Sequence, residues 1–268
     1  MIEKNRKLQS DLETLLKLRR DAVALKMVED LSEVPENAYR PSLDKKRYAL
    51  CQTLAMARLN RKTIFSEKAD QWCWSPLISY GMTELKEDTP EFELAASVMG
   101  IEDREKARDF VRRFPKLPYG KYAGILLAPL SEADFEPDVI LIYCKNYQLR
   151  SILMAVNYRE GDMLKSGFTP YASCVYSVIN PMLEGSYRIT LPDPGEFERA
   201  HTPDDDIIFS VPKQKLEDFE HGVAYLLGRG RTVNAFYPLI KSDFERPPFY
   251  NKLFTSWGLD TGEDWEKR

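Results

Sequence analysis

Four cysteines are the side chains of this sequence best suited to chemistry. Cys51, Cys73, Cys144 and Cys174 lie far apart along the chain, and no two of them form a Cys-x-x-Cys pair. Thiolates that converge in space bind zinc or iron–sulfur clusters, and dispersed ligands converge only through the fold. Because free cysteines are among the most buried residue types, four inert core thiols are the competing interpretation.

The local sequence around the cysteines predicts different environments for them. Cys144 ends the apolar stretch 139–144, which is typical of a buried strand and favours a core role. Cys51 falls on the apolar stripe of a helix expected over residues 42–60, so its side chain should face the core. Cys73 stands between two tryptophans, which would either shield a reactive thiolate from water or pack with it in the core.

Charged side chains next to apolar segments form a second set of candidates. Lys26 lies in the apolar segment 21–28, where it would either reach a bound anion or extend to water from the strand end. Segment 193–200 lies between two predicted strands and contains Pro-Gly. A turn there would present Glu198 and Arg199 on one side, either for binding or as a structural ion pair.

Standard catalytic and cofactor signatures are absent from the sequence. It contains no phosphate-binding P-loop, no Gly-x-Gly-x-x-Gly after a strand, no Gly-x-Ser-x-Gly and no His-Glu-x-x-His. The only histidines are His201 and His221, so one chain cannot build a zinc site from three imidazoles. The cysteines are therefore the leading candidates for a site.

The composition bounds the class of protein. The 268 residues are 43% hydrophobic and 30% charged, and 38 Lys and Arg against 42 Asp and Glu give a net charge of −4. These values are typical of a soluble globular protein with a sizeable core. Because the chain lacks a long basic stripe, it has no electrostatic footprint for nucleic acid or for an anionic membrane.

The start of the chain and its apolar stretches predict the compartment. Polar residues lead into an amphipathic helix expected over residues 4–18, which is unlike a signal peptide. The longest apolar stretches, 124–130 and 139–144, fall short of the roughly 20 residues that cross a bilayer. We therefore expect a cytoplasmic protein whose cysteines are thiols or metal ligands rather than disulfides, with oligomerisation left open.

Hydrophobic periodicity predicts an α+β fold in a single domain. Residues 1–116 should form a helical N-terminal part, residues 117–234 should contain the sheet, and residues 235–268 should form an ordered C-terminal wrap. Continuous apolar strands are expected at 124–127 and 139–144. We expect a mixed sheet, with the helical part packed on it.

Several segments in a fixed order resemble a known family. In the first half these are Val23-Ala24-Leu25-Lys26, the helix 51–58, and Cys73 leading to Gly81-Met82. In the second half they are 138–143, 147–150, 158–161, and 195–200 followed by the strand to Pro212. Together they resemble the domain of unknown function 169 family, the ArCR group of archaea and anaerobic bacteria, over about residues 12–228.

The resemblance carries no established activity, but it does single out particular cysteines. Cysteines recur in the family at the positions of Cys51, Cys73 and Cys174, which makes these three the candidate metal ligands. Some members also carry a cysteine near the position of Asp193. This sequence lacks that cysteine, so the resemblance does not support a four-thiolate site here and leaves a three-cysteine site, with one position for a carboxylate, water or substrate.

Our leading hypothesis is a protein that binds a small ligand, or a zinc or iron–sulfur centre ligated by the three cysteines, in redox or anaerobic metabolism. Polar contacts to a ligand would come from Lys26, Gln148, Glu198 and Arg199. These contacts and the three thiols should meet in one pocket.

Two alternatives come from other functional classes. The first is a metal-independent enzyme acting on a small acid or acyl compound, with Cys73 as nucleophile or Glu198 as general acid or base. No histidine is placed to activate the thiol, which counts against this alternative. The second is a non-catalytic subunit or scaffold.

Overall fold

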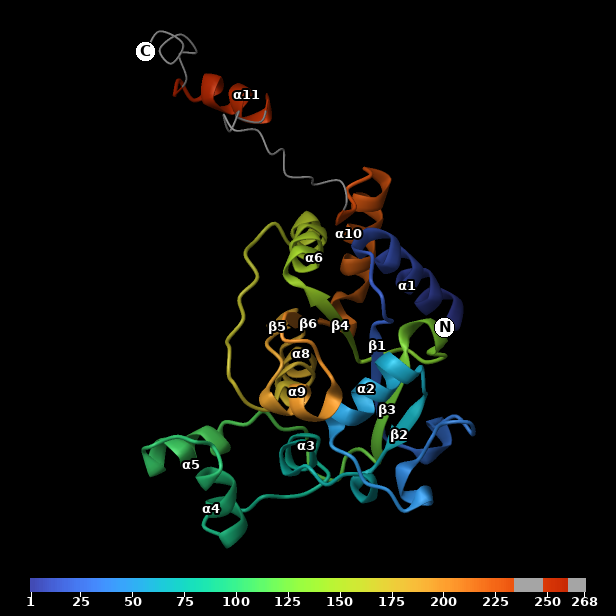
Figure 1. Cartoon of the computed structure of the whole chain (residues 1–268), viewed down its shortest axis with the longest axis vertical. Coiled ribbons are helices and arrows are strands. Elements are labelled where there is room, and N and C mark those ends of the chain that lie inside the picture. The colour runs from blue at the N-terminus through green and yellow to red at the C-terminus, as the bar shows by residue number, and fades with distance from the viewer. Residues whose placement is uncertain (234–247, 260–268) are drawn as a thin grey trace. The chain divides into compact units, whose positions relative to one another are not determined.

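A computed structural model of the chain describes residues 1–233 and 248–259 (Figure 1). The chain divides into two units, Met1–Val233 and Asn234–Arg268, and each is described by itself. In the second unit the described element is the helix α11 (Pro248–Ser256). The other parts of the expected C-terminal wrap, 234–247 and 260–268, lie outside the described residues.

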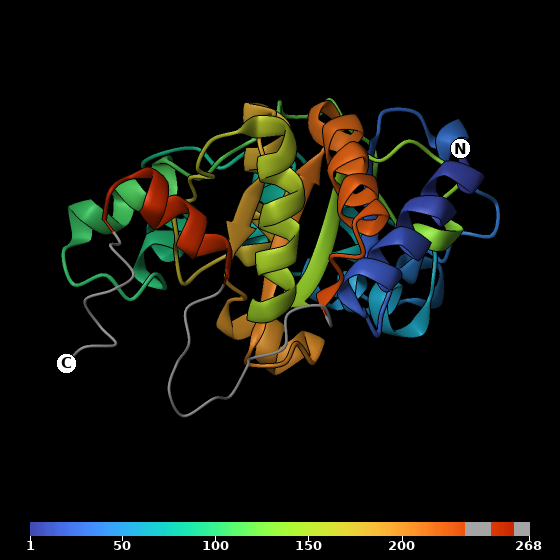
Figure 2. The same cartoon turned by 90° about the horizontal axis from the view of Figure 1, so that it is seen from above.

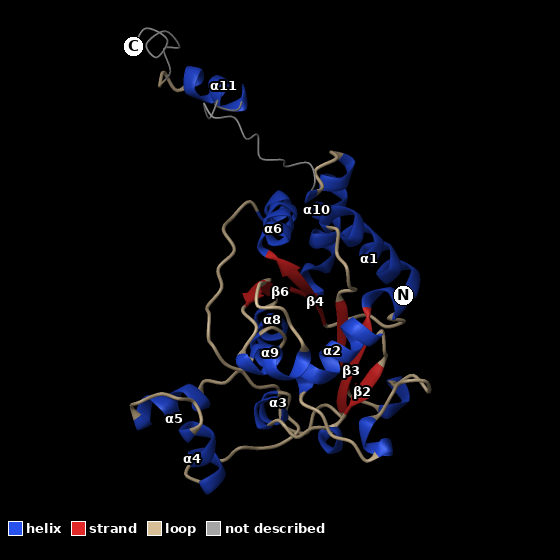
Figure 3. Ribbon diagram, in the orientation of Figure 1, coloured by secondary structure: helices blue, strands red, loops and turns tan. Residues whose placement is uncertain are grey.

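A six-stranded sheet crosses the first unit (Figure 3). Its strands are β1 (Val23–Val28), β2 (Ile64–Ser66), β3 (Gly124–Pro129), β4 (Val139–Lys145), β5 (Arg188–Thr190) and β6 (Asp206–Pro212). Their order in space is β2-β3-β1-β4-β6-β5. The predicted α+β class is confirmed.

The strand pairing is more regular than the mixed sheet that was expected. Every pair of neighbouring strands in this sheet is antiparallel, and parallel pairing occurs at two isolated bridges, Tyr39–Ile64 and Tyr48–Gln71. Strands β3 and β4 run in the same direction, but β1 lies between them and pairs with both. The strands of equal direction are therefore not neighbours.

Helices cover both faces of the sheet. The described helices of the first unit are α1 (Ile2–Leu16), α2 (Leu50–Asn60), α3 (Trp74–Ser79), α4 (Pro90–Ser97), α5 (Arg104–Arg112), α6 (Asn146–Glu160), α7 (Ser173–Tyr176), α8 (Ile179–Glu184), α9 (Pro194–Ala200) and α10 (Leu216–Gly228). Figure 2 shows α1, α6 and α10 side by side along one face. Helices α2, α7 and α8 belong to the opposite face.

The alternation of side chains along β1 separates two hydrophobic cores. Val23, Leu25 and Met27 belong to the core shared with α2, α7 and α8. Ala22 and Ala24 belong to the core shared with α1, α6 and α10. Successive residues of a strand point to opposite faces, and β1, β3, β4 and β6 each contribute to both cores. None of the described helices is long and apolar enough to cross a membrane.

Two local predictions were wrong in detail. The helix expected over 42–60 is a short 3-10 turn, Pro41–Asp44, followed by α2, which begins at Leu50. The turn expected within 193–200 is the helix α9. Asp193 caps this helix, because its carboxylate accepts a hydrogen bond from the Glu196 amide (3.0 Å) and Pro194 occupies the first helical position.

Candidate functional site

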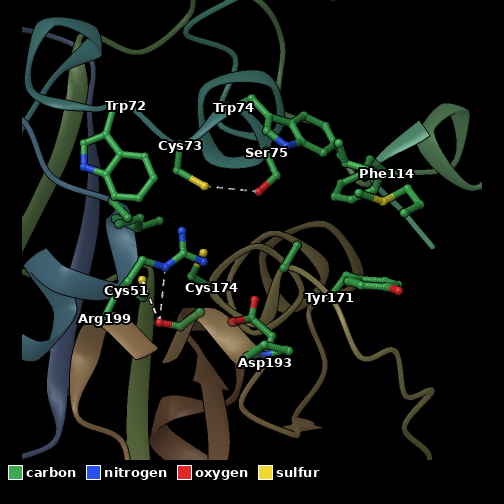
Figure 4. Close-up of a pocket in the computed structure, with 17 residues that line it drawn as sticks. Cys51, Trp72, Cys73, Trp74, Ser75, Phe114, Tyr171, Cys174, Asp193 and Arg199 are labelled. Carbon is green, nitrogen blue, oxygen red and sulfur yellow. Dashed lines mark hydrogen bonds between the residues drawn. The ribbon is translucent and has the colours of Figure 1, made fainter. Parts of the chain in front are cut away.

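The first turns of four helices line a pocket of about 310 Å³ (Figure 4). Cys51 and Cys174 lie in the first turns of α2 and α7, and Cys73 and Asp193 directly precede α3 and α9. Three of the four cysteines thus meet at one cavity, although they come from distant parts of the sequence. Trp72, Trp74, Phe114 and Met99 provide apolar walls.

Cys144 lies on the other face of the sheet. It is buried at the end of β4, in the core shared with α1, α6 and α10. Burial raises the pKa of its thiol to about 12. The prediction of a core role for Cys144 is therefore confirmed.

Cys51 occupies the second position of α2 and is 5% exposed, as the helical stripe predicted. Its thiol donates a hydrogen bond to the Gly195 carbonyl oxygen in α9 (3.7 Å). Burial raises the pKa of Cys51 to about 12, and the negative charge of Glu196 adds to the effect. In the free protein Cys51 is therefore a neutral thiol at neutral pH.

The other two pocket cysteines differ in exposure. Cys174 is buried, and its carbonyl oxygen accepts a hydrogen bond from the Tyr80 hydroxyl (2.8 Å). Burial raises the pKa of Cys174 well above its ordinary value. Cys73 directly precedes α3 and is half-buried, with its sulfur 3.8 Å from the Ser75 hydroxyl oxygen. Cys73 is thus the most accessible thiol of the pocket.

Arg199 brings a positive charge to the pocket. Its guanidinium carbon lies 5.3 Å from the centre of the Trp72 ring, which is a cation–π contact. Its Nε donates to the Gly195 carbonyl oxygen (3.4 Å), and Figure 4 shows the side chain pointing toward the cysteines. Within the described residues, no carboxylate forms an ion pair with Arg199. A predicted binding residue therefore lines the pocket without a direct ion pair, although the Asp193 carboxylate lies on the same wall.

Asp193 connects the two helices that begin beside it. One carboxylate oxygen accepts from the Glu196 amide in α9 (3.0 Å), and the other accepts from the Ser173 amide in α7 (2.9 Å). These two backbone donors hold the carboxylate in the pocket wall.

A buried polar network lies behind the pocket, next to Gly195. Glu196 is 0% exposed, and its carboxylate accepts hydrogen bonds from the hydroxyls of Tyr143 (3.1 Å) and Thr202 (2.7 Å). Burial raises the pKa of Glu196 to about 7. Arg58, also buried, stacks over the Tyr143 ring (3.8 Å) and donates to Thr202 (3.1 Å).

Sequence reasoning missed this network. It weighed Glu198, although the motif Asp193-Pro-Gly-Glu196 is a recognisable helix start, with a capping Asp and a Glu three positions later. That pattern predicts the start of α9, but it does not indicate that the Glu196 side chain is buried. Arg58 lies on the buried face of α2, and nothing in the sequence indicated its partners.

Three of the predicted ligand contacts lie elsewhere. Lys26, on β1, forms an ion pair with Glu33 (2.5 Å). Gln148 is buried at the start of α6, where its side chain donates to the Leu16 carbonyl (2.8 Å) and accepts from the Lys145 amide (2.7 Å). Glu198 is exposed on α9. None of these three side chains lines the cysteine pocket.

The donor geometry bears on metal binding. Over residues 1–233 and 248–259, no group of three or more His, Cys, Asp or Glu side chains could hold a metal ion. All four cysteines are free. The arrangement is thus a cavity with thiols on its walls, and not a closed tetrahedral site.

Comparison with known proteins places the chain in a family. It is 25% identical over 213 residues to an uncharacterised protein of Methanocaldococcus jannaschii. The aligned segment covers 79% of this chain and 90% of that protein. No solved structure matches it. The model of domain of unknown function 169, described as uncharacterised ArCR, matches residues 11–222, and the chain belongs to this family.

Proposed function

We propose that the protein binds a small, negatively charged ligand in the cysteine pocket. The observation that carries this proposal is the meeting of three thiols and the Arg199 guanidinium at a single cavity, where Arg199 has no ion-pair partner among the described residues. We place this function in the cytoplasm, because four free cysteines suit a reducing compartment.

The size and walls of the cavity suit a small molecule. A volume of about 310 Å³ lies at the lower end of the range for ligand sites, which is roughly 300–1,000 Å³. Aromatic and aliphatic side chains cover much of the wall, and Trp74 packs on Phe114 with ring centres 5.6 Å apart. Such walls remove water and strengthen the few polar contacts inside.

The charges in the pocket favour an anion. Cys51 and Cys174 are neutral thiols in the free protein, because burial raises the pKa of each. The Asp193 carboxylate already accepts two backbone hydrogen bonds. The first turn of the 11-residue helix α2 adds the partial positive charge of a helix start. The guanidinium of Arg199 is then the strongest available partner for a carboxylate or phosphate group.

The pocket supports binding more than nucleophilic catalysis. Neither His201 nor His221 lines it, so Cys73 has no imidazole base beside it. Glu198 lies on the surface, outside the cavity. No contact in the pocket therefore supports an enzyme that uses Cys73 as nucleophile or Glu198 as general acid or base.

Thermal unfolding of the purified full chain with added anions tests the proposal. The probes are inorganic phosphate, acetate and succinate, with glycerol as the neutral comparison. We expect at least one anion to raise Tm, and Arg199→Gln to abolish the rise. Arg19→Gln, which changes an exposed arginine outside the pocket, is the matched control and should keep it.

Two results would contradict the proposal. One is equal stabilisation of Arg199→Gln and the unchanged protein by every anion that acts. The other is a complete absence of stabilisation, together with a native mass spectrum, recorded after anaerobic purification, that contains the bare chain alone. A stoichiometric partner protein in that spectrum would instead favour the scaffold alternative.

A further inference from the structure

Resting on the proposed anion site, we infer that the ligand of the cysteine pocket is an aromatic monocarboxylate. Its carboxylate would pair with the Arg199 guanidinium, and its ring would lie against the aromatic and sulfur-bearing walls. This class of ligand uses both the charged and the apolar part of the cavity, and it gives the thiols a role as contact surface.

The walls of the cavity are rich in sulfur. Cys51, Cys73, Cys174 and Met99 all line it. Cys51 and Cys174 are neutral thiols, because burial raises the pKa of each, and a buried neutral thiol behaves as a small apolar group. Methionine sulfur also makes favourable contacts with aromatic rings. These walls therefore suit a ring better than a strongly hydrated ligand.

Aromatic side chains form another part of the wall. Trp72, Trp74, Phe114 and Tyr171 line the cavity, and Figure 4 shows Trp72 and Phe114 toward opposite sides of the view, with the cysteines between them. Trp74 and Phe114 pack at an interplanar angle of 50°, with ring centres 5.6 Å apart. Tilted and offset ring pairs gain from the ring quadrupole, which a saturated ring lacks. An aromatic ligand therefore fits this set better than an aliphatic one.

Gly195 allows the Arg199 side chain to fold back over the start of α9. A Cβ atom built on Gly195 would overlap Arg199 Nη2 and lie 2.8 Å from Arg199 Cζ. Arg199 Nε also donates a hydrogen bond to the Gly195 carbonyl oxygen (3.4 Å). A side chain at position 195 would displace the guanidinium, so the glycine is a positioning residue for the charge that faces the pocket.

Asp193 favours a ligand with one negative charge. Its Oδ1 lies 3.0 Å from the same Cβ position, so the carboxylate and the Arg199 guanidinium flank one glycine. Backbone amides hold both carboxylate oxygens in place. Among the described side chains that line the pocket, Arg199 is the only cation. A second negative charge on the ligand would therefore lack a cationic partner and would be repelled by Asp193.

Isothermal titration calorimetry of the purified, reduced full chain tests the class of ligand. Benzoate is the probe, and four comparison compounds each change one property. Acetate lacks the ring, cyclohexanecarboxylate has a saturated ring, terephthalate adds a second charge, and benzyl alcohol lacks the charge. We expect benzoate to bind at least about tenfold more tightly than acetate, because the ring removes apolar surface from water. The other three compounds should also bind more weakly than benzoate.

Two variants test the placement of the charge. Arg199→Gln removes the charge, whereas Gly195→Ala keeps it but displaces it. The group that overlaps the new Cβ is the flexible end of Arg199, and alanine favours helix, so Gly195→Ala should fold. Each variant should weaken benzoate binding by about tenfold or more.

Gly228→Ala is the matched control for the glycine variant. A Cβ atom at this position, at the end of α10, meets nothing within 4 Å, so benzoate binding should be unchanged. Circular dichroism and Tm of all three variants show that they are folded.

The outcomes separate this inference from the proposed function. Benzoate binding no tighter than that of acetate, or equally tight binding of any other comparison compound, overturns the aromatic monocarboxylate. Unchanged benzoate binding in folded Arg199→Gln also overturns it, and full binding by folded Gly195→Ala overturns the role of Gly195. If acetate or phosphate still raises Tm through Arg199 in these cases, the anion pocket stands without this ligand. If no anion raises Tm, the proposed function falls as well.

Discussion

The hydroxyl of Tyr143 donates a hydrogen bond to the buried carboxylate of Glu196 across 3.1 Å. Tyr143 lies on β4 and Glu196 on α9, so the bond ties the helix that carries Arg199 to the sheet. Thr202 supplies the second hydroxyl, and Arg58 stacks on the tyrosine ring. An acid held in this way titrates near neutral pH, beside the candidate ligand site.

This acid predicts a specific pH dependence of stability. Burial raises the pKa of Glu196 from 4.5 to about 7. Between these values the folded protein keeps a proton that the unfolded chain has lost, so the free energy of unfolding falls as pH rises. The fall amounts to about 3 kcal/mol and is complete above about pH 7. Urea unfolding at pH 5 and pH 8 measures it.

Glu196→Gln isolates the contribution of this acid. The amide keeps an oxygen that can accept from Tyr143, but it cannot ionise. From pH 5 to pH 8 the unchanged protein should lose about 3 kcal/mol of unfolding free energy that the variant does not lose. The variant should therefore gain about 3 kcal/mol relative to the unchanged protein over this range. If the plots of unfolding free energy against pH are parallel for the two proteins, Glu196 does not titrate between pH 5 and pH 8.

Arg58 lowers the pKa of the same carboxyl group, that of Glu196. Its guanidinium donates to Thr202 (3.1 Å) and to Asp206 (3.4 Å), and its positive charge lowers the pKa of Glu196 against the larger effect of burial. Arg58→Met should reduce the free energy of unfolding by about 3 kcal/mol, because it leaves buried acceptors without their donor. It should also raise the pKa of Glu196.

The second effect distinguishes an electrostatic role from loss of packing. We expect the decline in stability of Arg58→Met to extend to higher pH than in the unchanged protein. Arg58→Lys keeps the positive charge but loses the planar group that stacks over Tyr143. Compared with Arg58→Met, it should regain most of the normal pH dependence of stability but less of the unfolding free energy itself. Equal pH profiles in all three proteins would argue against the electrostatic role.

The cysteines should react with alkylating agents in a fixed order. Cys73 is half-buried, whereas Cys51, Cys144 and Cys174 are buried. Burial also raises the pKa of those three thiols, so little nucleophilic thiolate forms at pH 8. Iodoacetamide should therefore modify Cys73 at least about tenfold faster than any other cysteine.

Peptide mass mapping over time measures this order. In guanidinium chloride all four thiols should react at similar rates, which is the control for intrinsic reactivity. Early modification of Cys51 or Cys174 in the folded, metal-free protein would mean that the pocket opens more readily than its burial indicates.

Much of the fold followed from local patterns, because burial leaves a periodic trace in the sequence. The apolar run 139–144 predicted β4, and the stripe through Cys51 predicted the buried face of α2. Strand pairing left no such trace, since an apolar strand buried on both faces looks alike in parallel and antiparallel sheets. The position of β1 between β3 and β4 is set by tertiary packing, which local sequence patterns do not reveal.

The pocket was only partly predictable for the same reason. The family resemblance singled out Cys51, Cys73 and Cys174, and all three line one cavity. Lys26 and Gln148 looked equally suitable as polar contacts, but each is used by a nearby structural partner. The helix-capping rules could have identified Asp193 and the start of α9, whereas the contact of Glu196 with Tyr143 depends on how α9 packs against the sheet.

The contact between α6 and α10 gives a final prediction about the opposite face of the sheet. A Cβ atom built on Gly222 of α10 would lie 2.0 Å from the Ala155 carbonyl oxygen of α6, which is rigid helix backbone. Gly222→Ala should therefore force the helices apart and reduce the free energy of unfolding by about 1–3 kcal/mol. Gly228→Ala, at the end of the same helix, meets nothing within 4 Å and is the matched control. Because alanine favours helix over glycine by up to about 1 kcal/mol, the control should be neutral or slightly stabilising in urea unfolding. A Gly222→Ala variant as stable as this control would show that α6 and α10 do not pack this closely.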